Sequence, residues 1–264
     1  MAGIAYPEKP VSSPREARGE RRRWIEGDRP GTDRSFGMTA APDAPGRVLS
    51  REGPLGSVLL QDPTAGISLI DTEGRILWCN EQMARMTFGP DARADQFVGR
   101  TLFEILPREL AEHRVALMNR MAKEGGRPIF LRTIWRGLQQ ASFIQYVDPG
   151  DDGWPPHFVV ITRRYPGELS AELMVSGDYV VEESPYVSLG PLDVLTPCEL
   201  ELLALLAQGS SVKQIAVLPH RSEKTIETHR AAIGRKLKVG DRVLLADIAR
   251  KAGLTTTDVE RRRV

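Results

Sequence analysis

The order of apolar and polar residues divides the chain into two parts with different periods. In the first, apolar and polar residues alternate over "GISLIDTEGRILWCN", on both sides of Glu73-Gly74, which predicts two strands joined by a tight turn. Two short helical segments follow, and then a longer one, "RELAEHRVALMNRMAKEGG", whose apolar residues recur at the helical period. Three strand-like runs complete it: "PIFLRTIWRG", "ASFIQYVD" and "HFVVITRRY". This order predicts an α+β fold, a five-stranded antiparallel sheet with helices on one face.

The second part, from residue 191 onward, is predicted to be all-α with four helices. Thr196 and Glu199 fit a capping box, and Pro197 suits the first helical position. Ser211 and Ser222 stand where caps of the second and third helices belong. The fourth helix is expected in "DRVLLADIARKAGL".

Two segments show neither period. Residues 1–52 are rich in Pro, Gly, Arg and Asp, and they cannot bury enough apolar area to offset the entropy of ordering, so we expect a disordered tail. Met38 is a second candidate start, because the folded pattern begins only after it. Residues 166–190 are weakly patterned and are predicted to form a partly extended linker. The first domain is then 53–165 and the helical domain 191–264.

The third helix of the second part, within "HRSEKTIETHRAAIGRKLKV", has two different faces. At 100° per residue, Ile226, Ile233 and Leu237 fall within about 20° of one another and should pack on a core. The opposite face is small and polar near its start and basic toward its end: Lys224, Thr228, Ala231 and Arg235. A short capped helix and a turn precede it, which predicts a helix-turn-helix whose second helix enters the major groove of DNA.

Charge is distributed in agreement with this prediction. The chain has 264 residues and a net charge of +1, so the whole molecule is not a polycation. Residues 192–264 hold thirteen Lys or Arg against nine Asp or Glu, so they carry +4 while the rest carries −3. A modestly basic domain in a neutral chain fits a local DNA footprint.

The remaining composition narrows the class of protein. Two cysteines, Cys79 and Cys198, give neither a disulfide framework nor the spacing of a zinc site. No apolar run approaches the roughly 18 residues of a membrane span, and the N-terminus lacks the apolar segment of a signal peptide. We therefore expect a cytoplasmic protein with no membrane partner.

Residues 195–254 resemble the LuxR/GerE-type DNA-binding domain in "LTPCELELLALLAQG", "KQIA", "SEKTIETHRAAIGRKL" and "DRVLL". The resemblance implies that four residues read bases: Lys224, Glu227, Thr228 and Ala231. It implies that four others hold phosphates: Lys213, Thr225, Arg230 and Lys236. Ser222 and Arg235 complete the predicted DNA-binding set.

The same resemblance implies double-stranded DNA as the partner and a homodimer whose last helix, "VLLADIARKA", lies at a two-fold axis. Two recognition helices related by that axis predict a palindromic operator. The sequence departs from the family at Pro219, where the family has an apolar residue, so the second helix is expected to end early.

Residues 57–165 resemble a PAS domain in "GISLIDTEGRILWCN" and "FVGRTLFEIL". The resemblance implies a sensor or dimerisation module, with a cup that holds haem, flavin or a small ligand in some members. Cys79 lies at a strand end rather than in the helix motif of flavin-adduct domains, which argues against photochemistry. His113, on the long helix, is the single candidate haem ligand, but the charged neighbours Glu112 and Arg114 favour a surface or cap histidine. No cofactor is predicted, and haem or a small ligand stays a minor alternative.

These observations favour a sequence-specific DNA-binding transcriptional regulator with a PAS sensory or dimerisation domain. A phospho-receiver would need an acidic pair and a later Lys, and Asp71 has no such neighbours. An enzyme would need a nucleophile elbow, a phosphate loop or a metal cluster, none of which the sequence contains. The alternative is a PAS-mediated protein-interaction or haem/ligand-sensing protein whose helix-turn-helix serves mainly as a docking module.

Overall fold

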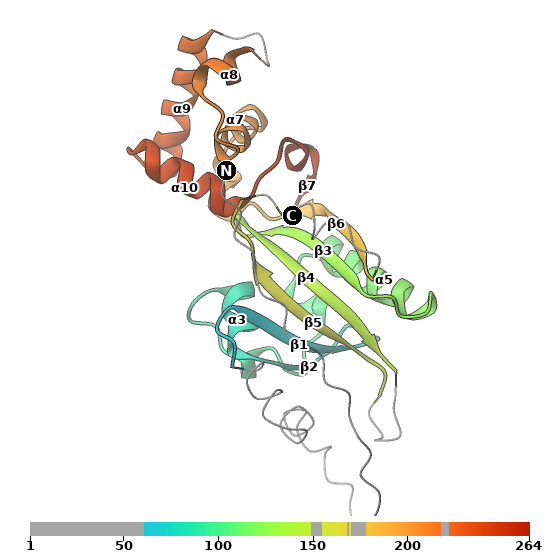
Figure 1. The fold of residues 1–264 in the computed structure, drawn as a ribbon. Coiled ribbons are helices and arrows are strands. Elements are labelled where there is room, and N and C mark those ends of the chain that lie inside the picture. The colour runs from blue at the N-terminus through green and yellow to red at the C-terminus, as the bar shows by residue number, and fades with distance from the viewer. Residues whose placement is uncertain (1–60, 149–154, 168, 170–177, 218–221) are drawn as a thin grey trace, which may run out of the picture. The chain divides into compact units, whose positions relative to one another are not determined.

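The computed structural model describes residues 61–148, 155–167, 169, 178–217 and 222–264 (Figure 1). The predicted tail 1–52 and the segment around Pro219 lie outside these residues. Within them, seven strands form one sheet in the order β2-β1-β5-β4-β3-β6-β7. Their bounds are β1 Ala65–Asp71, β2 Ile76–Cys79, β3 Ile129–Trp135, β4 Leu138–Val147, β5 His157–Arg164, β6 Val180–Val187 and β7 Arg262–Arg263.

The five predicted antiparallel strands, β1 to β5, are confirmed. The β3–β4 hairpin shows how local sequence sets its register. Trp135 pairs with Leu138, which leaves Arg136 and Gly137 as a two-residue turn. Both turn residues have positive φ, 52° and 76°. That conformation matches the twist of the flanking strands, and Gly137 adopts it without strain.

The prediction of a linker is wrong over Val180–Val187, which forms β6 and pairs in parallel with β3. β7, near the C-terminus of the predicted all-α domain, extends the sheet by pairing in parallel with β6. Pro185 explains the miss, because a proline within an apolar run argues against a strand except at an edge or an irregularity. The β3–β6 register does shift, between Arg132 and Ile134.

Three α-helices of the first domain pack against the sheet: α3 Glu81–Phe88, α4 Leu102–Ile105 and α5 Arg108–Lys123, with a short 3-10 helix, η1 Ala94–Gln96. The buried side of α5 meets the sheet in one core cluster, in which Leu117 and Met118 pack with Leu131 and Phe158. The predicted α+β arrangement is thereby confirmed.

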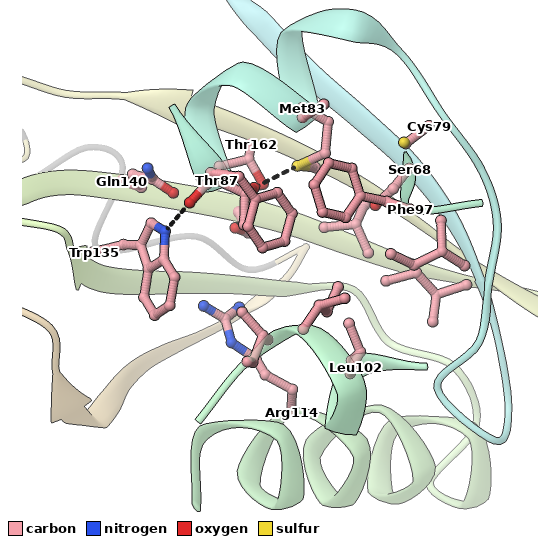
Figure 2. Close-up of a pocket in the computed structure, with 18 of the residues that line it drawn as sticks. Ser68, Cys79, Met83, Thr87, Phe97, Leu102, Arg114, Trp135, Gln140 and Thr162 are labelled. Atoms are coloured by element: carbon pink, nitrogen blue, oxygen red, sulfur yellow. Dashed lines mark hydrogen bonds between the residues drawn. The ribbon is translucent and has the colours of Figure 1, made fainter. Parts of the chain in front are cut away.

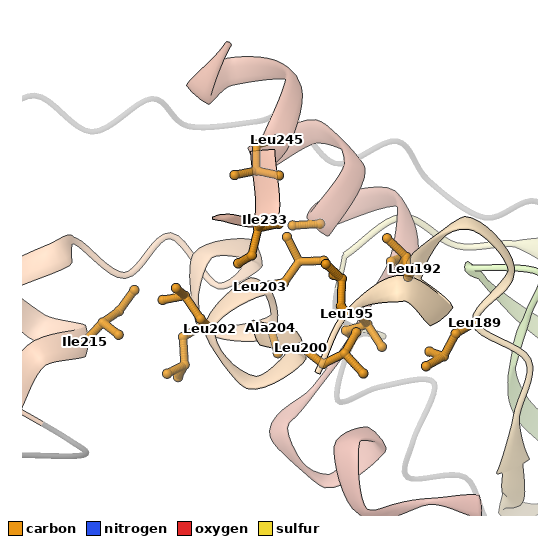
Figure 3. Close-up of a cluster of buried hydrophobic side chains, with 14 of the residues drawn as sticks. Leu189, Leu192, Leu195, Leu200, Leu202, Leu203, Ala204, Ile215, Ile233 and Leu245 are labelled. Atoms are coloured by element: carbon orange, nitrogen blue, oxygen red, sulfur yellow. The ribbon is translucent and has the colours of Figure 1, made fainter. Parts of the chain in front are cut away.

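The four predicted helices of the second domain are present among the described residues: α7 Pro197–Ala207, α8 Val212–Val217, α9 Glu223–Leu237 and α10 Arg242–Ala252. Short 3-10 helices flank them, η2 Gly190–Val194 before and η3 Thr256–Glu260 after. A shared core holds the helices together, as Figure 3 shows around Leu203, Ala204 and Ile233, each completely buried.

The predicted caps set where these helices begin. At α7, Glu199 N donates to Thr196 Oγ1 and Thr196 N donates to Glu199 Oε2, at 3.3 and 2.8 Å. Ser211 and Gln214 make the corresponding exchange at α8. At α9, Thr225 N donates to Ser222 Oγ at 3.1 Å. Each cap satisfies backbone N–H groups that a helix start leaves without partners.

Candidate DNA-binding face and sensor cavity

Helix α9 presents one apolar and one polar face, as its sequence predicts. Ile226 and Ile233 are 2% and 0% exposed and belong to the core cluster, while Leu237 packs partly buried against it. The core therefore fixes the rotation of α9 about its axis. The face opposite these three residues is left for solvent or for a partner.

All but one of the side chains predicted to contact DNA are exposed: Lys213, Ser222, Lys224, Thr225, Glu227, Thr228, Ala231, Arg235 and Lys236. Arg230 is half-buried and lines a pocket with Leu206 and Leu245. Among the described residues, neither Lys224 nor Arg235 forms an ion pair. Their charges are available to an external anion, whereas Arg230 lies at the margin of the face.

The N-terminal turn of α9 is held by its own hydroxyl groups. The Ser222 and Thr225 oxygens lie 2.8 Å apart, and Thr228 Oγ1 donates to the Lys224 carbonyl at 2.9 Å. These short contacts restrain side chains that the sequence predicts to meet DNA. Little conformational entropy would then be lost at this turn on binding.

Lys236 has a role that its sequence position did not indicate. Its Nζ lies 2.6 Å from Glu199 Oε2 of the α7 capping box. Burial opposes ionisation of Glu199, but the hydrogen bonds from Lys236 and Thr196 outweigh it, so the pKa of this carboxyl lies below its ordinary value. The Lys236 ammonium thus ties α9 to α7. A pair 37 residues apart in sequence leaves no local pattern from which to predict it.

Helix α10 buries one side and exposes apolar groups on another. Leu245 and Ala249 are 4% and 0% exposed, whereas Val243 and Leu244 are 72% and 56% exposed. Large apolar side chains next to each other on a surface mark a candidate contact site. This pair begins the helix that the sequence predicts at a two-fold axis.

The first domain contains a cavity of about 110 Å³ between the sheet and helices α3, α4 and α5. Its wall is mostly apolar and aromatic, and it includes Phe88 and Phe97, whose rings stack with centroids 3.8 Å apart. Figure 2 shows polar side chains that also line it: Ser68, Thr87, Arg114, Gln140 and Thr162. Ser142 belongs to the same lining. A concave, mainly apolar site with a few polar groups is the usual form of a small-ligand site.

Arg114 of α5 contributes a positive charge to this cavity. Its Nη2 donates to Thr133 Oγ1 of β3 at 2.9 Å. The side chain as a whole is half-buried, but its Nε is fully buried and has no hydrogen-bond partner among the described residues. Burial lowers the pKa of Arg114 to about 10, so the guanidinium still carries its charge near neutral pH. No local pattern in the sequence marks Arg114 as a residue that lines a cavity.

His113 is placed differently from its neighbour. Its ring lies edge-on to Tyr186 of β6, with centroids 6.0 Å apart, and it is not among the residues that line the cavity. Burial and the nearby Arg114 charge hold the pKa of His113 below its ordinary value. A haem would need an axial donor that faces a cavity far larger than this one. The geometry therefore does not favour the haem alternative.

Cys79 does line the cavity, and burial raises the pKa of its thiol to about 11. The thiol is thus protonated near neutral pH and is a poor nucleophile. No group of three or more His, Cys, Asp or Glu residues in the described part of the chain could hold a metal ion. In the same ranges, no helix is both long and apolar enough to span a bilayer.

Comparisons with known proteins assign both regions. Residues 193–249 match the family model "Bacterial regulatory proteins, luxR family", and residues 61–162 match the "PAS fold" model. The chain carries a PAS domain followed by a luxR-family helix-turn-helix domain. Both resemblances predicted from the sequence are confirmed.

Two relatives from Escherichia coli (strain K12) match over short stretches. Nitrate/nitrite response regulator protein NarP is 49% identical over 53 residues, which is 20% of this chain and 25% of NarP. The uncharacterized response regulatory protein YgeK is 42% identical over 62 residues, 24% of this chain and 42% of YgeK. The chain thus spans less than half the length of either relative.

Among solved structures, a complex of Vibrio cholerae VqmA with ligand and DNA covers 80% of this chain and 94% of its own. The sequence identity is 19% and the TM-score is 0.42. A likeness at this level does not extend what VqmA binds to this chain.

Proposed function

We propose that the protein is a sequence-specific DNA-binding transcriptional regulator in which the PAS domain senses a signal or supports dimerisation. The observation that carries the proposal is the polar face of α9. Core packing of Ile226 and Ile233 turns Lys224 and Arg235 outward, and neither is paired among the described residues. An exposed, unpaired cation on a recognition helix is suited to bind DNA phosphate or a base edge.

The side chains of α8 and α9 suggest two kinds of contact with DNA, to base edges and to phosphates. Lys224, Glu227, Thr228 and Ala231 would face base edges near the helix N-terminus, while Lys213 and Thr225 would hold phosphates that fix the register. Lys236 is left out of the phosphate set because Glu199 holds it. Arg230, half-buried, could reach a phosphate only from the edge of the interface.

We further propose that the protein binds DNA as a homodimer on a palindromic operator. Val243 and Leu244, exposed at the start of α10, support a contact between two copies at a two-fold axis. Two recognition helices related by that axis would enter major grooves about 34–36 Å apart, or a multiple of that spacing. Joining two weak half-site contacts raises affinity through effective concentration.

No catalytic role is proposed. The buried thiol of Cys79 and the isolated His113 are not arranged as a nucleophile with its base. A signal that reaches the PAS domain would therefore act through association or contact between domains rather than through chemistry.

The proposal is tested by selecting DNA sites for the full-length protein from a random library. The selected site is then footprinted, and its complex is sized by light scattering. We expect a palindromic site protected by two copies of the chain. A folded protein that retains no DNA at low salt would contradict the proposal and favour the docking-module alternative. A single copy on an asymmetric site would leave DNA binding intact but contradict the dimer.

A further inference from the structure

The cavity of the PAS domain contains a guanidinium without a carboxylate. We propose that it binds a small organic carboxylate, with Arg114 as the residue that anchors the carboxylate group. This inference rests on the proposed sensory role of the domain and names the chemical class of ligand that it would take. Among the described residues, no acidic group forms an ion pair with Arg114, although a charged group removed from water is costly unless it is paired.

A second arginine, in the sheet against which α5 packs, shows what a full set of hydrogen-bond and charge partners looks like. Arg132 of β3 bonds both oxygens of Asp258, at 2.8 and 2.7 Å, and its Nε donates to Gln139 Oε1 at 2.6 Å. In the part of the chain that the structure describes, Arg114 has the Thr133 hydroxyl alone. A hydroxyl can accept a hydrogen bond from a guanidinium, but it does not neutralise the charge. What Arg114 lacks, relative to Arg132, is a carboxylate.

The rest of the cavity favours an organic anion over an inorganic one. Ile70, Leu102 and Met118 belong to a wall that would gain from an apolar body, and phosphate has none to bury. Several of the other polar groups are already engaged. Ser142 and Thr162 bond each other at 2.9 Å, and Trp135 Nε1 donates to the Thr87 carbonyl at 2.7 Å (Figure 2).

Cavity size limits the ligand. A cavity of about 150 Å³ is known to hold benzene, so one of about 110 Å³ suits about four or five non-hydrogen atoms. Acetate and propionate fall in this range. Their carboxylate would meet Arg114 and their alkyl chain the apolar wall.

The experiment measures binding to the full-length protein by calorimetry and by thermal shift. The probes are acetate and propionate, the matched alcohols ethanol and 1-propanol, and inorganic phosphate. We expect saturable binding of a carboxylate and at least tenfold weaker binding of the alcohol of the same chain length. Arg114→Met should weaken carboxylate binding roughly tenfold to a hundredfold, because it removes a hydrogen bond to a charged group while keeping an unbranched side chain.

Arg108→Met is the matched control, since Arg108 lies on the same helix, is 85% exposed at its side chain and pairs with Glu112. Its affinity for the carboxylate should equal that of the unaltered protein. Ile105→Trp, which narrows the cavity and retains Arg114, should abolish carboxylate binding.

Several outcomes overturn the inference: no binding of either carboxylate, equal affinity for carboxylate and alcohol, or binding of phosphate alone. If Arg114→Met does not fold, the comparison of carboxylate with alcohol on the unaltered protein decides. A gel shift on the same samples separates the two proposals. If the protein binds DNA but no carboxylate, only this inference is contradicted. If it binds a carboxylate but no DNA, only the proposed function is contradicted.

Discussion

Arg132 of β3 and Asp258 of η3 form a buried, bidentate ion pair, although they lie 126 residues apart in the sequence. Their exposed fractions are 3% and 1%. Arg132 Nη2 also donates to the Gly253 carbonyl, at 2.8 Å, where α10 ends in the left-handed conformation. Arg261 adds contacts to Asp258 and to Glu183 of β6. The segment that follows the helix-turn-helix is thereby held on the PAS sheet through charge as well as through the β6–β7 pairing.

Removing one partner of this pair should be strongly destabilising. Asp258→Ala leaves the buried Arg132 guanidinium with only the more distant Glu183 carboxylate, 3.7 Å away, a loss expected to lower the free energy of unfolding by about 3–5 kcal/mol. Urea denaturation of the full-length variant measures it. Asp95→Ala, in the exposed Arg93–Asp95 pair, is the control and should change little. If Asp258→Ala lowers the free energy of unfolding no more than the control does, other contacts hold the segment on the sheet.

The elements of the fold that depend on residues close together in the sequence could be predicted from local sequence patterns. The strands β3 and β4, the capping box of Thr196 and Glu199, and the two faces of α9 each depend on residues a few positions apart, and each agrees with the sequence. Alternation and helical period record which side of an element is buried, so β1 to β5 and α7 to α10 could be predicted.

The remaining features depend on distant partners. β7 has two residues and no sequence pattern of its own. It forms because its backbone pairs with the edge strand β6. Arg132 and Lys236 are basic residues whose partners lie 126 and 37 positions away, so neither partner is visible in sequence. Arg114 and His113 are neighbours on the same helix, and the sequence alone favours His113 as a ligand because histidine is the more familiar ligand type. Only the fold shows which of the two faces the cavity.

The second prediction separates DNA contacts from structural charges on α9. Lys224→Ala and Arg235→Ala should weaken DNA binding without lowering the melting temperature, because both side chains are exposed and unpaired among the described residues. Each lost phosphate contact lowers the slope of log affinity against log salt by about one. Fluorescence anisotropy over a salt series measures both quantities.

Lys236→Met is the matched comparison for those two variants. Because Lys236 holds Glu199, this substitution should lower the melting temperature and leave the salt slope nearly unchanged. If Lys236→Met instead reduces the slope by one and Lys224→Ala does not, the assignment of the DNA-facing residues is reversed.

The third prediction concerns association through α10. Val243→Asp places a charge on a side chain that is 72% exposed, so the fold should tolerate it while a two-copy contact there should not. Sedimentation of the DNA complex should show one bound copy, or two with affinity reduced at least tenfold. Val217→Asp, on an equally exposed valine of α8, is the control and should keep two copies. Two copies bound equally well by both variants would place the dimer contact elsewhere.

The fourth prediction follows from His113. Burial and the Arg114 charge hold its pKa below 6.5 in the folded protein, while in the unfolded chain it returns to about 6.5. As pH falls below about 6.5 the unfolded state takes up a proton before the folded state does. The stability present above pH 6.5 is therefore lost progressively toward the lower, folded pKa. Among its neighbours, Arg120 opposes protonation of His113 in the same way and Glu182 favours it.

Thermal unfolding of the full-length protein between pH 8 and pH 5 tests this expectation. The unaltered protein should lose stability below about pH 6.5, whereas His113→Gln, which keeps a polar side chain of similar size, should show a flatter profile over that interval. The carboxyl groups whose pKa is lowered, such as Glu199 and Asp247, act only closer to their ordinary values of 4.5 and 3.8. Within the interval from pH 6.5 to 5, the comparison with His113→Gln then separates the contribution of His113 from that of the other three histidines. Identical profiles for the two proteins would mean that His113 takes up its proton equally in the folded and unfolded states, and that its ring is hydrated beside Tyr186.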